Sequence, residues 1–101
     1  MPAKYSQLIK AVDGRHKFQM IFYDAARKRI KTTSFGAKGY EDYTVHNDKV
    51  RQQSYIARHK ATERWDEYMS AGSLSRWVLW SKPTLAGAYK AYRQRFNLEL
   101  Y

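Results

Sequence analysis

Cysteine is absent from the sequence. Its absence excludes disulfide bonds, thiolate zinc sites and cysteine nucleophiles, and a small domain without disulfides is typical of a reducing compartment. The chain also lacks any run of about 20 apolar residues, the length that a membrane-spanning helix needs. No apolar signal segment follows residues 1–5. We therefore expect a protein that is not secreted and has no membrane partner, and that works in cytoplasm, nucleus or a particle assembled there.

Proline and glycine are scarce, with two and five residues in a chain of 101. So few breakers of regular structure predict that most of the chain is ordered, and neither a repeat nor a low-complexity tract interrupts it. Hydrophobic residues make up 44% of the sequence, enough for one modest core. We expect a single basic α+β domain over residues 1–101.

Acidic residues are also few: nine Asp and Glu face nineteen Lys and Arg, for a formal net charge of +10. Residues 1–40 and 71–101 carry the excess, whereas residues 41–70 are nearly neutral. Repulsion among the surplus positive charges destabilises a small folded chain, and a bound polyanion would offset this repulsion. This balance favours nucleic acid as the partner.

The first third of the chain has the pattern of an antiparallel meander. Strands are expected over 6–12, 17–23 and 28–35, with turns at Asp13-Gly14 and over 24–27. In the third strand, alternation puts Arg29, Lys31 and Thr33 on one face. We therefore predict that this face is markedly basic.

Helical patterns fill the remainder. Asn47 or Asp48 would cap a helix that runs to about Lys60, Ser73 a helix over 74–80, and Thr84 a final helix over 85–96. The resulting expectation is a three-stranded antiparallel meander followed by about three helices, a βββααα order with the helices packed on the sheet.

Three clusters are candidates for binding phosphate groups. Basic side chains lie at the hairpin tip and along its return strand, where a two-stranded ribbon can enter a groove or follow a backbone; the alternative is an edge strand charged against aggregation. The loop over 36–39 can form an anion nest with Lys38, or can simply reverse the chain. A helical face combines an aromatic ring with two cations, suited to phosphate contact and base stacking unless the ring packs inward. The predicted nucleic-acid-binding residues are Arg27, Lys28, Arg29, Lys31, Lys38, Arg51, Tyr55 and Arg58.

Catalysis has weaker support. His46 lies near Asp42 and Asp48, and a histidine among acids can hold a divalent metal as in a nuclease. The spacing matches no known ligand pattern, and Asp48 already has a capping role. We therefore predict no catalytic residue, no metal and no cofactor.

Several motifs resemble a family of small basic proteins of uncharacterised function, encoded mainly by giant nucleocytoplasmic DNA viruses. The resemblance spans roughly residues 17–97. It is carried by residues 31–40, Asp42-Tyr43-Thr44, His46, Asp48-Lys49, Arg51, Tyr55, Arg58-His59-Lys60, Ala71-Gly72, Leu74-Ser75, Trp77, Leu79-Trp80, Lys82-Pro83-Thr84-Leu85, Tyr92 and Arg95-Phe96. Residues 66–68 depart from the Asn-Asp-Pro-like turn expected there.

The resemblance implies a viral protein located in the virion or in the cytoplasm or nucleus of the host. The first functional hypothesis is a non-enzymatic nucleic-acid-binding protein of a large DNA virus, with DNA favoured over RNA, phosphate contacts and low sequence specificity. A second is a minor capsid or core component that binds other virion proteins. A third is a metal-dependent nuclease that uses His46 and Asp48.

Overall fold

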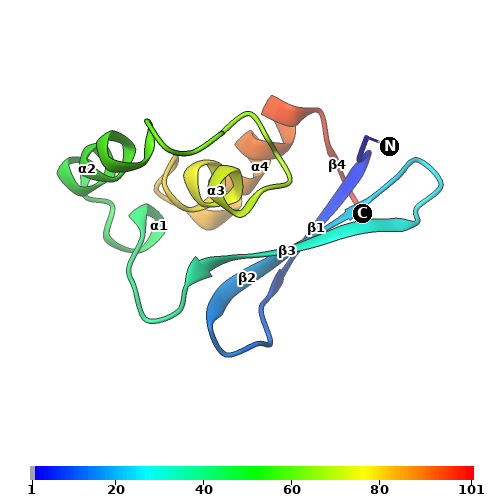
Figure 1. Ribbon diagram of the computed structural model, residues 1–101, viewed down its shortest axis with the longest axis horizontal. Coiled ribbons are helices and arrows are strands. Elements are labelled where there is room, and N and C mark those ends of the chain that lie inside the picture. Colours follow the sequence, from blue (N-terminus) through cyan, green and yellow to red (C-terminus); the bar gives the residue numbers. More distant parts are fainter. Residues whose placement is uncertain (1) are drawn as a thin grey trace.

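The computed structural model describes residues 2–101 and combines a four-stranded sheet with helices on one of its sides (Figure 1). The elements in chain order are β1 (Tyr5–Lys10), β2 (His16–Tyr23), β3 (Arg29–Ala37), α1 (Tyr43–His46), α2 (Lys49–His59), α3 (Ala71–Leu74), η1 (Ser75–Leu79), α4 (Leu85–Phe96) and β4 (Glu99–Leu100). The α+β class is confirmed.

The sheet has the order β3-β2-β1-β4. The antiparallel meander of β1, β2 and β3 is confirmed, and the end of each strand lies within two residues of its predicted position. The sheet is not limited to three strands, however, because β4 pairs with β1 in parallel. A strand of two exposed residues has no alternating pattern, so the sequence could not predict it.

Helix caps explain where the helices begin. The Asp48 carboxylate accepts from the backbone N–H groups of Val50 and Arg51, and the Thr84 hydroxyl accepts from that of Gly87, as predicted. Asn47 instead ends α1 in the left-handed conformation, with φ 53°. The one-turn helix α1 was not predicted.

Ser73 was predicted as an N-cap, and this is wrong. The cap of α3 is Ser70, whose hydroxyl accepts from the N–H of Ser73. Ser73 itself is fully buried and donates its hydroxyl to the carbonyl of Trp65 at 2.9 Å. The helix then continues into η1, a π-helical turn closed by a bond from the Trp80 N–H to the Ser75 carbonyl.

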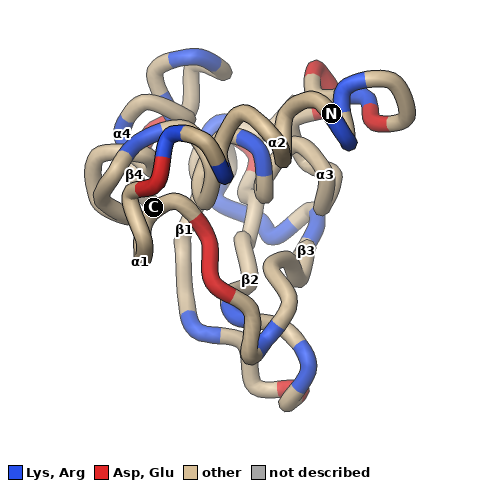
Figure 2. The backbone as a smooth tube through the Cα atoms, turned by 90° about the vertical axis from the view of Figure 1, so that its left-hand side faces the viewer, with Lys and Arg blue, Asp and Glu red and all other residues tan. Residues whose placement is uncertain are grey.

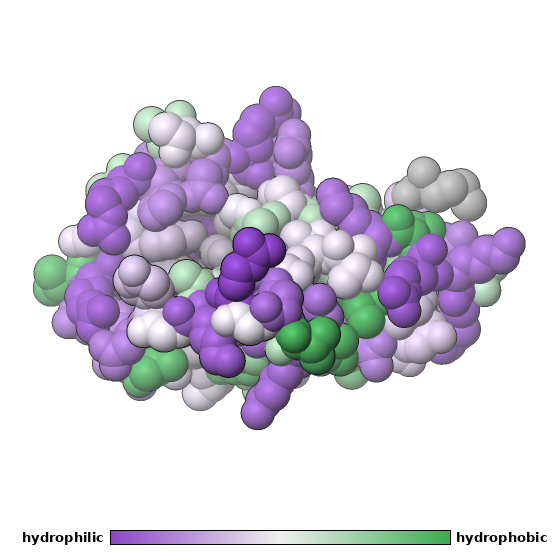
Figure 3. Space-filling view, turned by 60° about the horizontal axis from the view of Figure 1, so that its bottom comes forward, coloured by the Kyte–Doolittle hydropathy of each residue, from purple (hydrophilic) through white to green (hydrophobic). Residues whose placement is uncertain are grey.

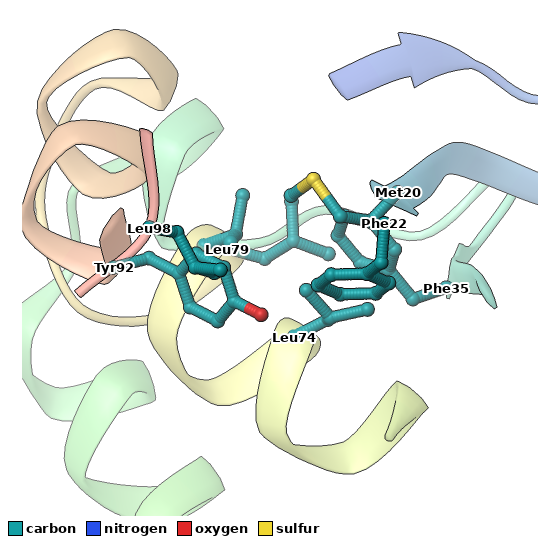
Figure 4. Close-up of a cluster of buried hydrophobic side chains, with 8 residues drawn as sticks. Met20, Phe22, Phe35, Leu74, Leu79, Tyr92 and Leu98 are labelled. Carbon is teal, nitrogen blue, oxygen red and sulfur yellow. The ribbon is translucent and has the colours of Figure 1, made fainter. Parts of the chain in front are cut away.

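The core lies between the sheet and the segment formed by α3, η1 and α4. Met20, Phe22 and Phe35 from the strands meet Leu74 and other apolar side chains from the helical layer (Figure 4). The other members of this buried cluster are Val78, Leu79, Tyr92 and Leu98. Burial of such side chains stabilises the fold by about 1.5–3 kcal/mol each, so this cluster fixes α4 and η1 against the sheet.

A β-bulge overturns the prediction that Arg29 and Lys31 share a face. Arg29 pairs with Tyr23, whereas Lys31 pairs with Phe22, and the register shifts between these two neighbours. Ile30 is the extra residue, and it packs against the core. Since neighbouring positions of β2 point to opposite faces, Lys31 lies on the helix side of the sheet and Arg29 on the other.

The side of the sheet turned away from the helices is mostly hydrophilic, with separate apolar patches (Figure 3). Ile21 and Tyr23 of this side are nevertheless buried. Tyr101 covers Tyr23, with ring centroids 3.5 Å apart and nearly parallel planes. Among residues 2–101, none of the helices has the length and apolar character needed to cross a membrane.

Candidate functional site

The turn between β2 and β3 and the first residue of β3 form a hairpin tip, residues 24–29, with three exposed cations. The buried Asp24 carboxylate accepts from the backbone N–H groups of Ala26 and Lys28 at 2.9 and 3.0 Å. Arg27 adopts a left-handed conformation, with φ 64°. The only acid of the turn is thus engaged by backbone, and Arg27, Lys28 and Arg29 project from a fixed scaffold.

Two tyrosine rings lie beside Arg27 of the hairpin tip. The Arg27 guanidinium carbon lies 4.6 Å from the ring centroid of Tyr5 and 5.3 Å from that of Tyr101. Such contacts attract a cation electrostatically without neutralising its charge. Arg27 is therefore held in place without a carboxylate that would neutralise it.

The opposite end of the molecule contains a cleft of about 620 Å³, here called the α2 cleft. Arg51 and Arg58 line it from α2, and both are exposed. Arg51 forms an ion pair with Glu41 at 3.1 Å. Two of the predicted cations therefore share this cleft, one of them already paired.

Tyr55 also lines the α2 cleft, but both faces of its ring are covered. Its centroid lies 4.4 Å from that of Trp80, with parallel planes, and 4.4 Å from that of His59. Burial raises the pKa of the Tyr55 hydroxyl well above its usual range. The ring therefore packs α2 against the end of η1 and is not open to stacking by a base.

The α2 cleft contains charges of both signs. Lys17 contacts Asp42 at 2.6 Å in a largely buried ion pair, and His59 contacts Glu63 at 2.5 Å. Carboxylates repel phosphate groups, so this mixed cleft is a weaker attractor for a polyanion than the hairpin tip.

The glycine loop over 36–39 reverses the chain. Gly36 and Gly39 have positive φ angles of 78° and 90°. The Lys38 backbone N–H donates to the carbonyl of Arg15 at 3.0 Å, so it is not available to an anion nest. The exposed Lys38 side chain remains as the loop's contribution to the basic surface.

The eight predicted residues do not form one surface. The hairpin tip and α2 lie at opposite ends of the longest dimension, 42 Å (Figure 1). Lys31 lies between them, at a hollow that Asp66 and Glu67 also line. Figure 2 shows Lys and Arg positions distributed around the chain rather than gathered on one side.

Few of the cations are neutralised by carboxylates. Within residues 2–101, only Lys4, Lys17, Arg51 and Arg64 of the nineteen lie within 4.0 Å of an acidic side chain. The acidic groups that lack such a partner serve turns, caps or histidines. The surplus positive charge is therefore open to external anions.

A basic pocket beside α4 was not predicted from the sequence. Arg76, Lys82 and Arg95 line it together with Trp77. These residues come from η1, the turn after it and α4, and only tertiary packing brings them together. The one signal for this pocket in the sequence was the charge of residues 71–101, which contain five cations and one acid.

His46 and Asp48 have local structural roles. The Asp48 N–H donates to Nδ1 of His46 at 2.9 Å, and the Asp48 carboxylate caps α2. In the described part of the chain, no three His, Asp or Glu side chains form a group that could hold a metal ion. This arrangement offers no support to the nuclease hypothesis.

Comparison with known proteins gives one result. No curated protein and no solved structure matches the chain. The model of a family of unknown function, DUF5754, matches residues 7–59, from β1 to the end of α2. Since this match covers just over half of the sequence, the chain belongs to the DUF5754 family.

Proposed function

We propose that the protein binds nucleic acid without catalysing a reaction on it, through phosphate contacts of low sequence specificity. The observation that carries the proposal is the surplus of cations that no carboxylate neutralises, distributed over both ends of the molecule. A long polyanion can contact several such patches at once, whereas a compact acidic ligand would engage only one.

The hairpin tip is the principal contact in this proposal. Arg27, Lys28 and Arg29 project from a turn whose own acid is buried and engaged. A basic two-stranded ribbon fits a nucleic-acid groove or lies along its phosphates. Lys31, Lys38, Arg51 and Arg58 would add contacts when a strand bends around the molecule, and Tyr55 would support α2 from within.

DNA is the expected ligand, and genome packaging in a large DNA virus is the expected setting. The resemblance of residues 17–97 to proteins of such viruses motivates this part of the proposal, together with the net charge of +10. Charge on several sides suits a protein packed between DNA segments, because each segment meets unpaired cations.

Duplex DNA titrations at two salt concentrations test the proposal. Binding driven by counterion release weakens steeply with salt, with a slope of about −0.9 per phosphate neutralised in a plot of log K against log salt. The double variant Lys28→Gln/Arg29→Gln should lower affinity about tenfold and flatten the slope by about 2.

Lys60→Gln/Arg64→Gln is the matched control. It removes the same charge from the loop after α2, where Arg64 already contacts Asp66 and Glu67. It should lower affinity by less than about threefold. No binding, binding insensitive to salt, or equal losses in both variants would contradict a role for the hairpin tip.

A second candidate function, as a virion component that binds another protein, rests on a different observation. Val45 and Val50 are 60% and 75% exposed, and a shallow groove lined by Lys49, Val50, Gln53, Ser54 and Ala57 follows α2. Contiguous exposed apolar surface marks sites of protein contact, and Val50 and Ala57 would supply part of such a surface. Localisation in disrupted virions separates the two: genome-associated protein favours the first function, shell-associated protein the second.

A further inference from the structure

A pocket of about 640 Å³ lies between η1, the turn that follows it and the last two turns of α4. Its charged and polar lining consists of Arg76, Ser81, Lys82, Gln94 and Arg95, beside the ring of Trp77. The pocket is thus lined by three cations and no acid. This contrasts with the α2 cleft, which three carboxylates line.

Two guanidinium groups gather around one indole ring in this pocket. The guanidinium carbon of Arg76 lies 4.3 Å from the Trp77 centroid, and that of Arg95 lies 3.8 Å from it. Trp77 is fixed in turn, because its indole N–H donates to the Trp65 carbonyl at 3.1 Å. The ring therefore attracts both guanidinium groups and offsets part of the repulsion between their like charges.

These cations have no acidic partner in residues 2–101. Burial lowers the pKa of the Arg76 guanidinium, and the nearby positive charge of Arg95 lowers it further. Arg76 donates from Nη1 to the Trp80 carbonyl at 3.4 Å, while its buried Nε finds no partner within the described chain. An anion bound in the pocket would relieve the repulsion between the two arginines.

We propose that the pocket formed by Arg76, Lys82 and Arg95 binds a phosphate group. A guanidinium presents paired N–H donors that match two phosphate oxygens, and Lys82 adds a mobile point charge. The volume is within the range of sites for nucleotide-sized ligands. Because the arginines occupy the surroundings of Trp77, the site recognises the phosphate and not the base.

This inference rests on the proposed function in one respect: a nucleic-acid strand is the expected carrier of the phosphate. A free nucleotide carries the same group. The experiment therefore uses inorganic phosphate, a deoxynucleoside 5′-monophosphate, the matching nucleoside and a 12-mer DNA without terminal phosphates. The readouts are the NMR signal of the Trp77 indole N–H and dissociation constants from calorimetry.

Phosphate and the monophosphate should shift the Trp77 signal saturably, and the nucleoside should not. Arg95→Gln should weaken phosphate binding at least about tenfold, since the variant loses a charge-assisted hydrogen bond to the phosphate. Lys90→Gln removes the same charge from α4 outside the pocket. It should change the dissociation constant for phosphate by less than about twofold. Lys82→Gln, in an exposed turn, provides a second variant that does not disturb the packing around Trp77.

The 12-mer distinguishes the two sources of the phosphate. If it shifts the Trp77 signal, backbone phosphates enter the pocket; if only the monophosphate does, the pocket takes terminal phosphates, and either result supports the proposal. No shift with any phosphate, or equal effects of Arg95→Gln and Lys90→Gln, would overturn it. If Arg95→Gln loses phosphate binding in the pocket but still binds duplex DNA in a salt-dependent way, the proposed function does not depend on this pocket.

Discussion

Gly36 shows how one residue without a side chain positions two layers of the fold. It lies near the end of β3 with φ 78°, a conformation that other residues adopt only at a cost. A Cβ atom there would lie 2.9 Å from Cδ1 of Leu79 and 3.3 Å from Cβ of Lys17. The close approach of β3 to η1, and with it one wall of the α2 cleft, therefore depends on glycine at this position.

Gly36→Ala should destabilise the protein by about 2–4 kcal/mol, because the strained φ angle and the contact with Leu79 add together. Gly14→Ala is the control: its φ is 79°, but nothing lies within 4 Å of the new Cβ. That variant should lose only about 1 kcal/mol. Urea unfolding of both variants measures the difference, and equal losses would show that the contact with Leu79 costs nothing.

At the scale of elements, α4 is attached to the rest of the fold through Tyr92. Its ring is 1% exposed, and its hydroxyl donates to the Tyr68 carbonyl at 2.5 Å. Burial raises the pKa of this hydroxyl far above its ordinary value. The same cause acts on Tyr55 of α2. Two helices are thus held by tyrosines that must stay protonated.

These tyrosines make the fold sensitive to high pH. In the unfolded chain they lose their protons near pH 10, whereas in the folded chain they keep them. Above about pH 10 the unfolded state therefore binds fewer protons, and stability falls by about 1.4 kcal/mol per pH unit for each tyrosine.

Tyr92→Phe removes one of these groups. The variant should be about 1–2 kcal/mol less stable at pH 7, because the Tyr68 carbonyl loses its donor. Between pH 10 and 11.5 its stability should then decline less steeply than that of the parent protein. Urea unfolding at several pH values measures both effects. Parallel declines would mean that Tyr92 ionises as readily in the folded state as in the unfolded one.

Elements with a strong local signal were predicted from the sequence. The meander follows from alternation and turn residues, and α2 and α4 follow from the caps Asp48 and Thr84. The bulge at Ile30, the π-helical turn η1 and the pairing of β4 with β1 depend on packing between distant segments. No local pattern specifies such contacts, which is why the basic face of β3 was predicted wrongly.

At the scale of the whole molecule, net charge dominates. Few ion pairs oppose the repulsion among nineteen cations, and those present are mostly exposed. Exposed pairs contribute about 0–1 kcal/mol each. The sequence predicted this excess and its concentration in residues 1–40 and 71–101. It could not predict that 42 Å separates the ends of the molecule, nor that Arg76 and Arg95 meet at Trp77.

Added salt should therefore stabilise the protein. Salt screens repulsion between exposed charges over about 10 Å at 0.1 M. Raising sodium chloride from 20 to 300 mM should raise Tm by a few degrees, about the effect of 1 kcal/mol in a domain of this size. Calorimetry at constant pH measures this, and a fall in Tm would mean that the ion pairs outweigh the repulsion.

The parallel pairing of β4 with β1 has a consequence for the order of folding. The bonds from the Glu99 N–H to the Lys4 carbonyl and from the Tyr101 N–H to the Ser6 carbonyl enclose nearly the whole chain. Loop closure over such a distance is costly in entropy, and the ladder pairs just two residues of β4 with β1. This ladder should form last and open first, exchanging its amide hydrogens before the meander does. Each opening leaves β1 as a bare sheet edge, the point at which strands of two molecules would join.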